Sequence, residues 1–221
     1  MLSVIIPTIN AEAHLHQTLQ SVGEDVQVLV VDGGSTDNTL LIANEARAQV
    51  FSVEPGRGRQ LAMGADKASG PWLLFLHADT TLPKDWQVLA QAFMDDPLNA
   101  RRAAYFWLGF DDNSTGANRV AALANWRAQT FGLPYGDQGL LIHKDFYTEV
   151  GGFHPDQHLM EDVDLVRRIG PMRLKRLHGT VTTSAERYRR TGWWARPLKN
   201  LLCLSLYLIG APKSWYQRLY G

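Results

Sequence analysis

Two patterns of apolar residues alternate along the first third of the chain: short continuous runs, and residues spaced by three or four positions. Short β-branched runs are typical of buried strands, and apolar residues spaced by three or four positions are typical of one helix face. The runs predict strands at Leu2–Pro7, Val26–Val31, Val50–Val53 and Trp72–Leu76, with helices at Ala11–Val22, Thr36–Ala46 and Gly58–Ala68 between them. Strands joined by one helix each favour right-handed βαβ units and a parallel sheet.

The remainder up to residue 186 is less regular but continues the same domain. The pattern predicts helices at Lys84–Phe93, Thr115–Phe131, Lys144–Val150 and Met160–Ile169, and strands at Ala103–Phe110, Gly139–His143 and Met172–Leu177. No internal repeat or low-complexity linker interrupts it. We therefore expect an α/β fold with a mixed, mainly parallel sheet flanked by helices, formed by residues 1–186.

Residues 187–221 read as a helical appendage with an amphipathic character. Its apolar core, within Pro197–Ile209, has about a dozen residues, short of the ~20 that a membrane-spanning helix needs. Basic and aromatic residues flank this core, as in helices that lie on a membrane surface. Docking on the domain and pairing with a second subunit are open alternatives. The flanking residues are Arg187, Arg189, Arg190, Trp193, Trp194, Arg196, Lys199, Lys213, Trp215, Tyr216 and Arg218.

Composition indicates an ordinary globular protein of 221 residues, with 45% hydrophobic residues. A single cysteine, Cys203, excludes an internal disulfide and suits a reducing compartment. The first ten residues lack the basic region and long apolar run of a secretion signal. We expect a cytoplasmic location. The appendage favours peripheral attachment to the inner face of the cell membrane as an alternative.

Charge is balanced overall but not along the chain. Of 22 basic and 22 acidic residues, twelve basic residues and one acid, Glu186, lie from Arg167 onward. Such a basic end suggests an anionic partner, either a phosphate-bearing substrate or a membrane surface. Mutual neutralisation of the two parts across an internal interface is the alternative. Nothing points to nucleic acid as a partner.

Candidate chemistry gathers at the carboxyl ends of the predicted parallel strands, where such sheets bind ligands. Asp32 precedes two glycines, and this turn suits a nucleotide base or ribose, or is a plain strand–helix turn. Arg57 and Arg59 stand among glycines before a helix, which favours an anion such as pyrophosphate, or a solvated loop. Asp79 would face phosphates only through a divalent cation, Mg²⁺ or Mn²⁺; otherwise it caps its strand.

The segment Met160–Leu165 offers further carboxylates on a predicted helix. Helical spacing puts Asp162 on the apolar side with Leu165, where an ionised carboxylate near the helix start suits a general base. An N-cap role is the alternative. The same spacing puts Glu161 on the opposite side with Asp164, where it would be solvated or ion-paired.

Taken in order, these motifs resemble the inverting glycosyltransferases of family 2, which have the GT-A fold, a Rossmann-like fold of nucleotide-diphospho-sugar transferases. The GDQG and FLHADT forms are similar to a bacterial subfamily labelled arsenosugar-biosynthesis-type glycosyltransferases. The matching stretches are SVIIPTIN at 3–10, VVDGGSTDNT at 30–39, GRGRQLAMGA at 56–65, LLFLHADT at 73–80, GDQG at 136–139 and MEDVDL at 160–165.

The resemblance implies a role for each matching residue. It implies a donor nucleoside-diphosphate sugar, a metal on Asp79, and Asp162 as the base that deprotonates the acceptor hydroxyl. The implied donor-site residues are Pro7, Thr8, Asp32, Arg59, His77 and Asp79, and the implied acceptor- or sugar-site residues are Asp137, Gln138 and Glu161.

The chain departs from the family pattern at three positions. Ala11 stands where many members have glutamate, and Gly33 where many have a second aspartate. His77 replaces the first aspartate of the DxD motif, so one carboxylate is left for the metal. His77 would ligate the metal, donate to phosphate or pack under the loop. His178, after the last predicted strand, is a further candidate metal ligand.

The function expected is therefore metal-assisted glycosyl transfer with inversion. A nucleotidyltransferase of similar fold and a non-catalytic nucleotide-sugar-binding module at a membrane are the rivals. The acceptor is open, with a lipid-linked molecule or a soluble small molecule as candidates, and a homodimer is an open alternative for the assembly.

Overall fold

The computed structural model describes residues 1–157 and 159–220. Two of the basic residues expected beside the C-terminal helix, Lys213 and Arg218, have side chains outside this description. No helix in the described part is long and apolar enough to cross a membrane.

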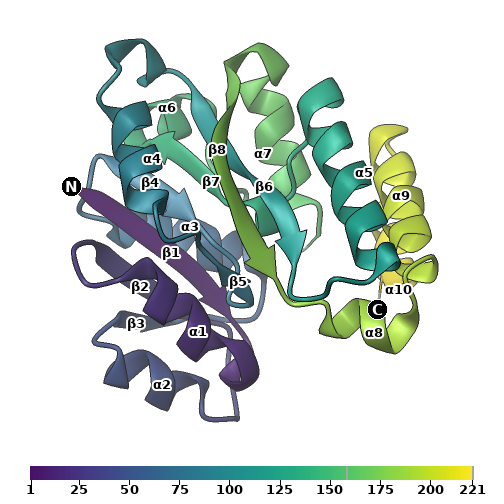
Figure 1. Ribbon diagram of the computed structural model, residues 1–221, viewed down its shortest axis with the longest axis horizontal. Coiled ribbons are helices and arrows are strands. Elements are labelled where there is room, and N and C mark those ends of the chain that lie inside the picture. The colour runs from purple at the N-terminus through teal and green to yellow at the C-terminus, as the bar shows by residue number, and fades with distance from the viewer. Residues whose placement is uncertain (158, 221) are drawn as a thin grey trace.

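A single eight-stranded sheet forms the centre of the domain (Figure 1). Its strands are β1 (Leu2–Thr8), β2 (Gln27–Asp32), β3 (Gln49–Ser52), β4 (Trp72–Phe75), β5 (Thr80–Thr81), β6 (Ala103–Phe110), β7 (Leu140–His143) and β8 (Leu174–Thr183). They lie in the order β3-β2-β1-β4-β7-β6-β8-β5. β1 to β4 pair in parallel, whereas β7 is antiparallel to both of its neighbours. This confirms the mixed sheet that the sequence predicts.

Helices cover both faces of the sheet. They are α1 (Glu12–Val22), α2 (Thr39–Glu45), α3 (Arg57–Lys67), α4 (Trp86–Met94), α5 (Thr115–Phe131), α6 (Lys144–Glu149), α7 (Glu161–Ile169), α8 (Glu186–Thr191), α9 (Ala195–Leu208) and α10 (Lys213–Tyr220). In Figure 1, α1, α2 and α4 lie in front of the sheet, and α3, α6 and α7 lie behind it.

Alternation along the strands builds one core on each face. Val4 and Ile6 of β1 join the core under α1 and α4, whereas Ile5 between them joins the core under α3 and α7. β4 does the same, with Leu74 on the first face and Leu73 on the second. Because successive side chains of a strand point to opposite faces, β1 and β4 each contribute to both layers and are buried throughout.

Two elements differ from the prediction for local reasons. β8 continues to Thr183 instead of ending at Leu177, because buried Val181 and Thr183 keep the two-residue alternation beyond Gly179. α2 begins at Thr39 rather than Thr36, since the Asp37 carboxylate accepts hydrogen bonds from the backbone N–H and the hydroxyl of Thr39. Residues 36–38 therefore form a turn.

The C-terminal helices dock on the domain. Cys203 and Leu204 of α9 and Tyr216 of α10 form a small core with Met160 and Val163 of α7. Trp193, before α9, lies against Gly116 at the start of α5, where an added Cβ would come within 2.6 Å of the indole. Of the three arrangements considered for the appendage, one side of α9 thus shows docking on the domain.

Candidate active site

A cleft opens where β1 and β4 end. Ile5 pairs with Phe75, so the chain after each strand reaches the same edge of the sheet. The cleft measures about 440 Å³ and also takes in the first turns of α1 and α8. Its lining residues are Pro7, Ile9, Asn10, Ala11, Glu12, Ala13, His14, Asp37, Arg57, His77, Ala78, Asp79, Ser184, Glu186 and Arg187. The sequence predicts Pro7, His77 and Asp79 at this edge, and the structure brings them together.

Asp32 shapes the wall of this region rather than lining the cleft. Its carboxylate accepts hydrogen bonds from the Thr8 hydroxyl, from the backbone N–H of Gly34 and Ser35, and from the Ser35 hydroxyl. Burial alone would raise the pKa of Asp32, but these bonds hold it below its usual value. Four bonds fill the acceptor sites of a carboxylate. Contrary to the sequence prediction, Asp32 and buried Thr8 are therefore engaged with each other and the turn.

Of the two arginines in the first turn of α3, the one that lines the cleft is Arg57. Its Nε lies 3.5 Å from Oε1 of Glu161. Arg59 instead pairs with exposed Glu54 and, at 4.0 Å, with Asp156. The sequence predicts Arg59 near the nucleotide base or diphosphate, whereas the structure places Arg57 at the cleft and Arg59 outside its lining. Residues two apart on a helix point in nearly opposite directions, so only one of the pair faces the cleft.

His77 separates the cleft from a small inner cavity and lines both. Its imidazole packs against Gly136, where an added Cβ would lie 2.5 Å from Nε2. Burial holds the pKa of His77 well below 6.5, and the charges of Arg57 and Arg187 lower it further. His77 is therefore neutral at physiological pH, and Gly136 is the residue that leaves room for its ring.

Asp79 presents a carboxylate to the cleft. In the described part of the chain no protein hydrogen bond or ion pair engages this carboxylate, whereas its backbone carbonyl accepts from Ser184. Among the described residues no group of three or more His, Cys, Asp or Glu side chains could enclose a metal ion. Mg²⁺ is commonly held by one or two carboxylates together with substrate phosphates, so Asp79 fits a cation that the donor diphosphate also ligates.

His178 does not belong to this site. It is exposed within β8, where its Nδ1 lies 3.5 Å from Nη2 of Arg176. β8 meets β5 at Thr183, next to Asp79, and His178 lies five residues earlier along this strand. The prediction that His178 ligates the metal is therefore wrong for this structure, because the strand runs on past it.

Asp162 lies behind His77, at the start of α7. Its Oδ2 accepts a hydrogen bond of 2.7 Å from the backbone N–H of Gly136, and its Oδ1 accepts one from Val163. It lines the inner cavity of about 20 Å³, which also borders Tyr135 and Glu161. That volume holds about one water molecule. The N-cap of α7 is Met160, so Asp162 is not the cap that the sequence left as an alternative.

The sequence predicts that Glu161 is either solvated or ion-paired. The structure shows that it is buried and that it forms an ion pair with Arg57. Burial raises its pKa to about 7; the charge of Arg57 opposes this rise and the charge of Asp162 adds to it. The side of α7 that the sequence leaves open to solvent is covered by the start of α3, because Gly58 meets the backbone carbonyls of His154 and Gln157 too closely for any Cβ.

Glu161→Gln should change how stability depends on pH. The folded chain keeps a proton on Glu161 up to about pH 7, whereas the unfolded chain releases it near 4.5, so wild-type stability falls as pH rises between these values. Glutamine cannot ionise. We expect equal free energies of unfolding below pH 4.5 and a variant more stable by up to about 3 kcal/mol at pH 8, measured by urea denaturation. A wild-type chain that gains on the variant above pH 7 would contradict this.

The loop before β7 places Asp137 and Gln138 differently. Burial raises the pKa of Asp137 to about 6; the charge of Arg127 opposes this rise, and the charges of Asp162 and Asp79 add to it. Gln138 is fully buried, and its amide donates to the Phe106 carbonyl and to Asn125 Oδ1. The prediction that Gln138 faces the sugar or acceptor is thus wrong for this conformation, in which it anchors the loop.

A family model described as glycosyl transferase family 2 matches residues 3–139, more than half of the chain. The chain belongs to glycosyl transferase family 2. The match includes the strand ends that line the cleft and stops at the loop of Asp137, so α7 and the C-terminal helices lie outside it.

Curated relatives of this family 2 chain match over shorter stretches. The PGL/p-HBAD biosynthesis glycosyltransferase of Mycobacterium bovis is 42% identical over 93 residues, which cover 37% of this chain and 36% of the relative. The poly(ribitol-phosphate) beta-N-acetylglucosaminyltransferase TarS of Staphylococcus aureus is 33% identical over 109 residues, covering 42% of this chain and 19% of that protein. The chain thus spans little more than a third of the first of these relatives.

Solved structures show the fold over nearly the whole chain. TarS of S. aureus, residues 1–349, has a TM-score of 0.66 at 18% identity and covers 99% of this chain and 68% of its own. Glucosyl-3-phosphoglycerate synthase of M. tuberculosis, solved with Mn²⁺, UDP and glucosyl-3-phosphoglycerate, has a TM-score of 0.61 at 18% identity, covering 97% and 81%. The architecture is the GT-A fold, and the relatives and fold neighbours are glycosyltransferases, which supports an enzyme.

Proposed function

We propose that this family 2 chain transfers a sugar from a nucleoside-diphosphate sugar to an acceptor hydroxyl with inversion at the anomeric carbon. One observation carries the proposal: Asp79 presents to the cleft a carboxylate that no described hydrogen bond or ion pair engages, and Asp162 lines the small cavity on the other side of His77. Solved fold neighbours bind UDP or UDP-GlcNAc, so uridine-diphosphate sugars are the first donors to test.

In this reaction Asp162 takes the proton of the acceptor hydroxyl. The acceptor oxygen forms a bond to the anomeric carbon while the bond from that carbon to the diphosphate oxygen breaks, and the nucleoside diphosphate leaves. The hydrogen bond from Gly136 fixes the position of the Asp162 carboxylate. One displacement at one face of the sugar inverts its configuration.

Negative charge builds on the diphosphate as it leaves, and two cationic side chains, Arg57 and Arg187, line the cleft where it would lie. A divalent cation on Asp79 would offset the same charge. The neutral imidazole of His77 adds no charge but fills the space between cleft and inner cavity.

Arg57→Ala should weaken donor binding far more than Arg59→Ala does. Losing a charge-assisted contact to phosphate costs about 1.5–3 kcal/mol, or about 10- to 150-fold in affinity. Among the described residues Arg59 forms ion pairs with exposed Glu54 and Asp156, and such surface pairs contribute about 0–1 kcal/mol. Titration calorimetry with UDP and Mn²⁺ on both variants checks this, and an equal effect of the two substitutions would contradict the placement of Arg57.

A thermal-shift panel tests the proposed function as a whole. Nucleoside diphosphates and nucleotide sugars are each added with and without Mn²⁺, and stabilisation is about 2.7 kcal/mol at a hundredfold excess over Kd. No response to any of them counts against the proposal. Products then separate the rivals: free nucleoside diphosphate indicates glycosyl transfer, pyrophosphate indicates nucleotidyl transfer, and binding without turnover indicates a binding module.

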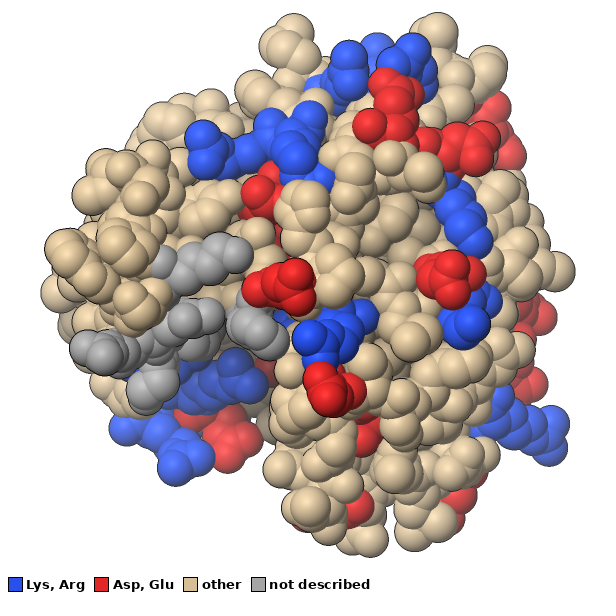
Figure 2. Space-filling model, turned by 180° about the vertical axis from the view of Figure 1, so that it is seen from behind, with Lys and Arg blue, Asp and Glu red and all other residues tan. Residues whose placement is uncertain are grey.

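Peripheral contact with a membrane at its cytoplasmic face is part of the same proposal. The side of α9 away from the domain exposes Trp194, Leu198, Leu202 and Ile209, the last to 77%. In Figure 2, the described atoms at the left, where α5 and α9 lie, are mostly uncharged, and basic side chains lie beside acidic ones at the lower edge. Apolar side chains next to basic ones suit an interfacial helix.

A further inference from the structure

An apolar groove runs between α5 and α9 and ends at the active-site loop. It measures about 460 Å³, within the range of about 300–1,000 Å³ that small-molecule sites have. Its lining residues are Leu108, Val120, Leu123, Ala124, Trp126, Arg127, Phe131, Leu133, Tyr135, Asp137, Tyr188, Pro197, Asn200, Leu201, Leu204 and Leu208. The groove is separate from the proposed donor cleft, and the proposed base does not line it.

The sequence builds the walls of the groove by helical spacing. Val120, Leu123, Arg127 and Phe131 recur on one side of α5, and Leu201, Leu204 and Leu208 recur on one side of α9, with separations of three or four residues. The two walls do not close on each other. Leu201 is 58% exposed and Trp126 57%, so apolar surface is left open along the mouth.

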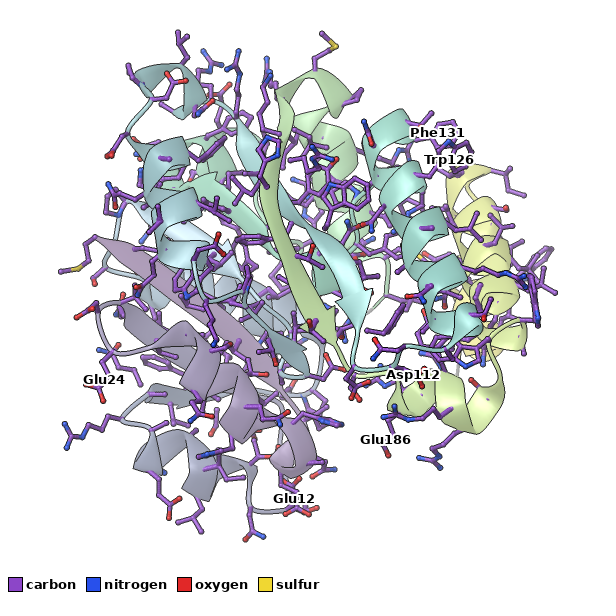
Figure 3. The ribbon with its side chains drawn as sticks, in the orientation of Figure 1. Glu12, Glu24, Asp112, Trp126, Phe131 and Glu186 are labelled. Carbon is purple, nitrogen blue, oxygen red and sulfur yellow. The ribbon has the colours of Figure 1, made fainter. Side chains whose placement is uncertain are left out.

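Trp126 and Phe131 mark one end of the mouth. Figure 3 shows them together at the end of α5, near α9, and their ring centroids lie 5.2 Å apart. At the other end Tyr135 and Asp137 line the groove, and Tyr135 also lines the inner cavity of Asp162. Tyr135 therefore lies between the inner end of the groove and the cavity of the carboxylate that we propose as the base.

Three buried polar atoms lie in this otherwise apolar setting. In the described part of the chain, Nη2 of Arg127, Oδ1 of Asp137 and Oδ1 of Asn200 are the buried side-chain atoms without a hydrogen-bond partner, and all three residues line the groove. Arg127 is held in place by its Nε, which donates to the Leu133 carbonyl, and by the ring of Tyr135, 3.4 Å below its guanidinium. Unpaired buried polar atoms cost free energy unless a ligand engages them.

We propose that this α5–α9 groove binds the acceptor, an amphiphile whose hydrocarbon chain lies between the helices and whose neutral, hydroxyl-bearing head reaches Arg127, Asp137 and Asn200. The inference rests on the proposed transferase function and names its acceptor class. A hydroxyl both donates and accepts, so it matches a guanidinium donor beside a carboxylate acceptor and an amide. The carboxylate of Asp137 at the inner end, and that of Asp162 in the neighbouring cavity, would repel a phosphate head.

The location of the groove agrees with this occupant. Its outer wall is α9, whose exposed apolar side chains and neighbouring arginines Arg190 and Arg196 suit an anionic membrane surface. A chain drawn from such a surface would enter beside Leu201 and Leu208. A flat contact between two copies of the protein would bury the apolar rim but would leave the three inner polar atoms unpaired.

Titration calorimetry on the full chain tests the proposal with three named probes: decyl β-D-glucoside, decyl phosphate and free glucose, each below the concentration at which amphiphiles form micelles. We expect decyl glucoside to bind at least tenfold more tightly than decyl phosphate and glucose to show no saturable binding. Decyl phosphate binding as tightly as the glucoside overturns the neutral head, and glucose binding equally well overturns the apolar chain.

Two matched substitutions on α9 locate the binding. Leu201→Glu changes a residue of the groove, whereas Leu198→Glu changes one that is 67% exposed and outside the groove lining, so both variants should fold. We expect the first to weaken decyl glucoside binding at least tenfold and the second to leave it unchanged. Equal effects overturn the groove. A dimer that Leu201→Glu dissociates, with no amphiphile binding, overturns the proposal in favour of a second copy.

Donor binding on the same preparation separates the two levels of inference. If UDP-N-acetylglucosamine with Mn²⁺ binds and decyl glucoside does not, the acceptor assignment fails and the transferase proposal stands. If no nucleotide sugar from the panel binds, the transferase proposal fails, and the acceptor assignment falls with it even where the amphiphile binds.

Discussion

Asp162→Asn is expected to lower kcat by about 10²–10⁴-fold while leaving the affinity for the nucleotide sugar unchanged. Asparagine has the same shape as aspartate, and its amide oxygen can still accept the hydrogen bond from Gly136, so the loop should stay in place. What it cannot do is take a proton from the acceptor. Release of nucleoside diphosphate under saturating donor measures kcat, and thermal shift with UDP and Mn²⁺ measures donor affinity.

Asp145→Asn is the matched control, because it removes an exposed carboxylate from the start of α6 without touching the cleft. Its turnover should equal that of the wild type. Near-normal transfer by Asp162→Asn would remove Asp162 from the role of base. Asp137 would then be the next candidate, since its pKa of about 6 keeps it largely ionised at neutral pH and its Oδ1 is unpaired.

The strand ends could be predicted from sequence because their cause is local. β1 and β4 are short apolar runs that end where polar residues begin, and parallel pairing then brings Pro7 and Asp79 to one edge of the sheet. The helical tail was equally visible, since its apolar and basic residues are adjacent in sequence. The strand ends and the helical tail both follow from the spacing of apolar residues and from the order of residues along the chain.

Roles that depend on remote packing could not be predicted. Helical spacing places Glu161 away from the apolar side of α7, but it carries no information that α3 and the loop at Gln157 cover that side too. Spacing also shows that Arg57 and Arg59 point apart without showing which one meets the cleft. Gln138 looks like a site residue until β6 and α5 supply the Phe106 carbonyl and Asn125.

Two residues of the site, Arg187 and Arg127, were not predicted as site residues, although both stand out in the sequence as basic residues. Arg187 belongs to the basic run that we assigned to an appendage starting at that residue, yet it lines the donor cleft from the first turn of α8. Arg127 lies in an amphipathic helix, where a lone arginine is ordinarily solvated, and it is enclosed here by Leu133, Tyr135 and the docking of α9 beside α5. The division between domain and appendage therefore does not separate the site from the tail.

Asp79→Ala should abolish the dependence of donor binding on Mn²⁺ and lower turnover by about 10²–10³-fold. Asp79 supplies the carboxylate oxygens that the described part of the cleft offers to a cation without competition from a protein hydrogen bond or ion pair. Without it, UDP should give the same thermal shift with and without Mn²⁺, whereas the wild type should be stabilised more by UDP when Mn²⁺ is present, because stabilisation rises as Kd falls.

The pattern across variants is more informative than either loss alone. Asp66→Ala, which removes an exposed carboxylate of α3, should keep the full Mn²⁺ response. Asp162→Asn should keep it as well, although it turns over slowly. A variant Asp79→Ala that retains the Mn²⁺-dependent shift would mean that cleft residues other than Asp79, such as His14 or Glu186, hold the cation, because these two side chains also line the cleft and already form a pair at 3.0 Å.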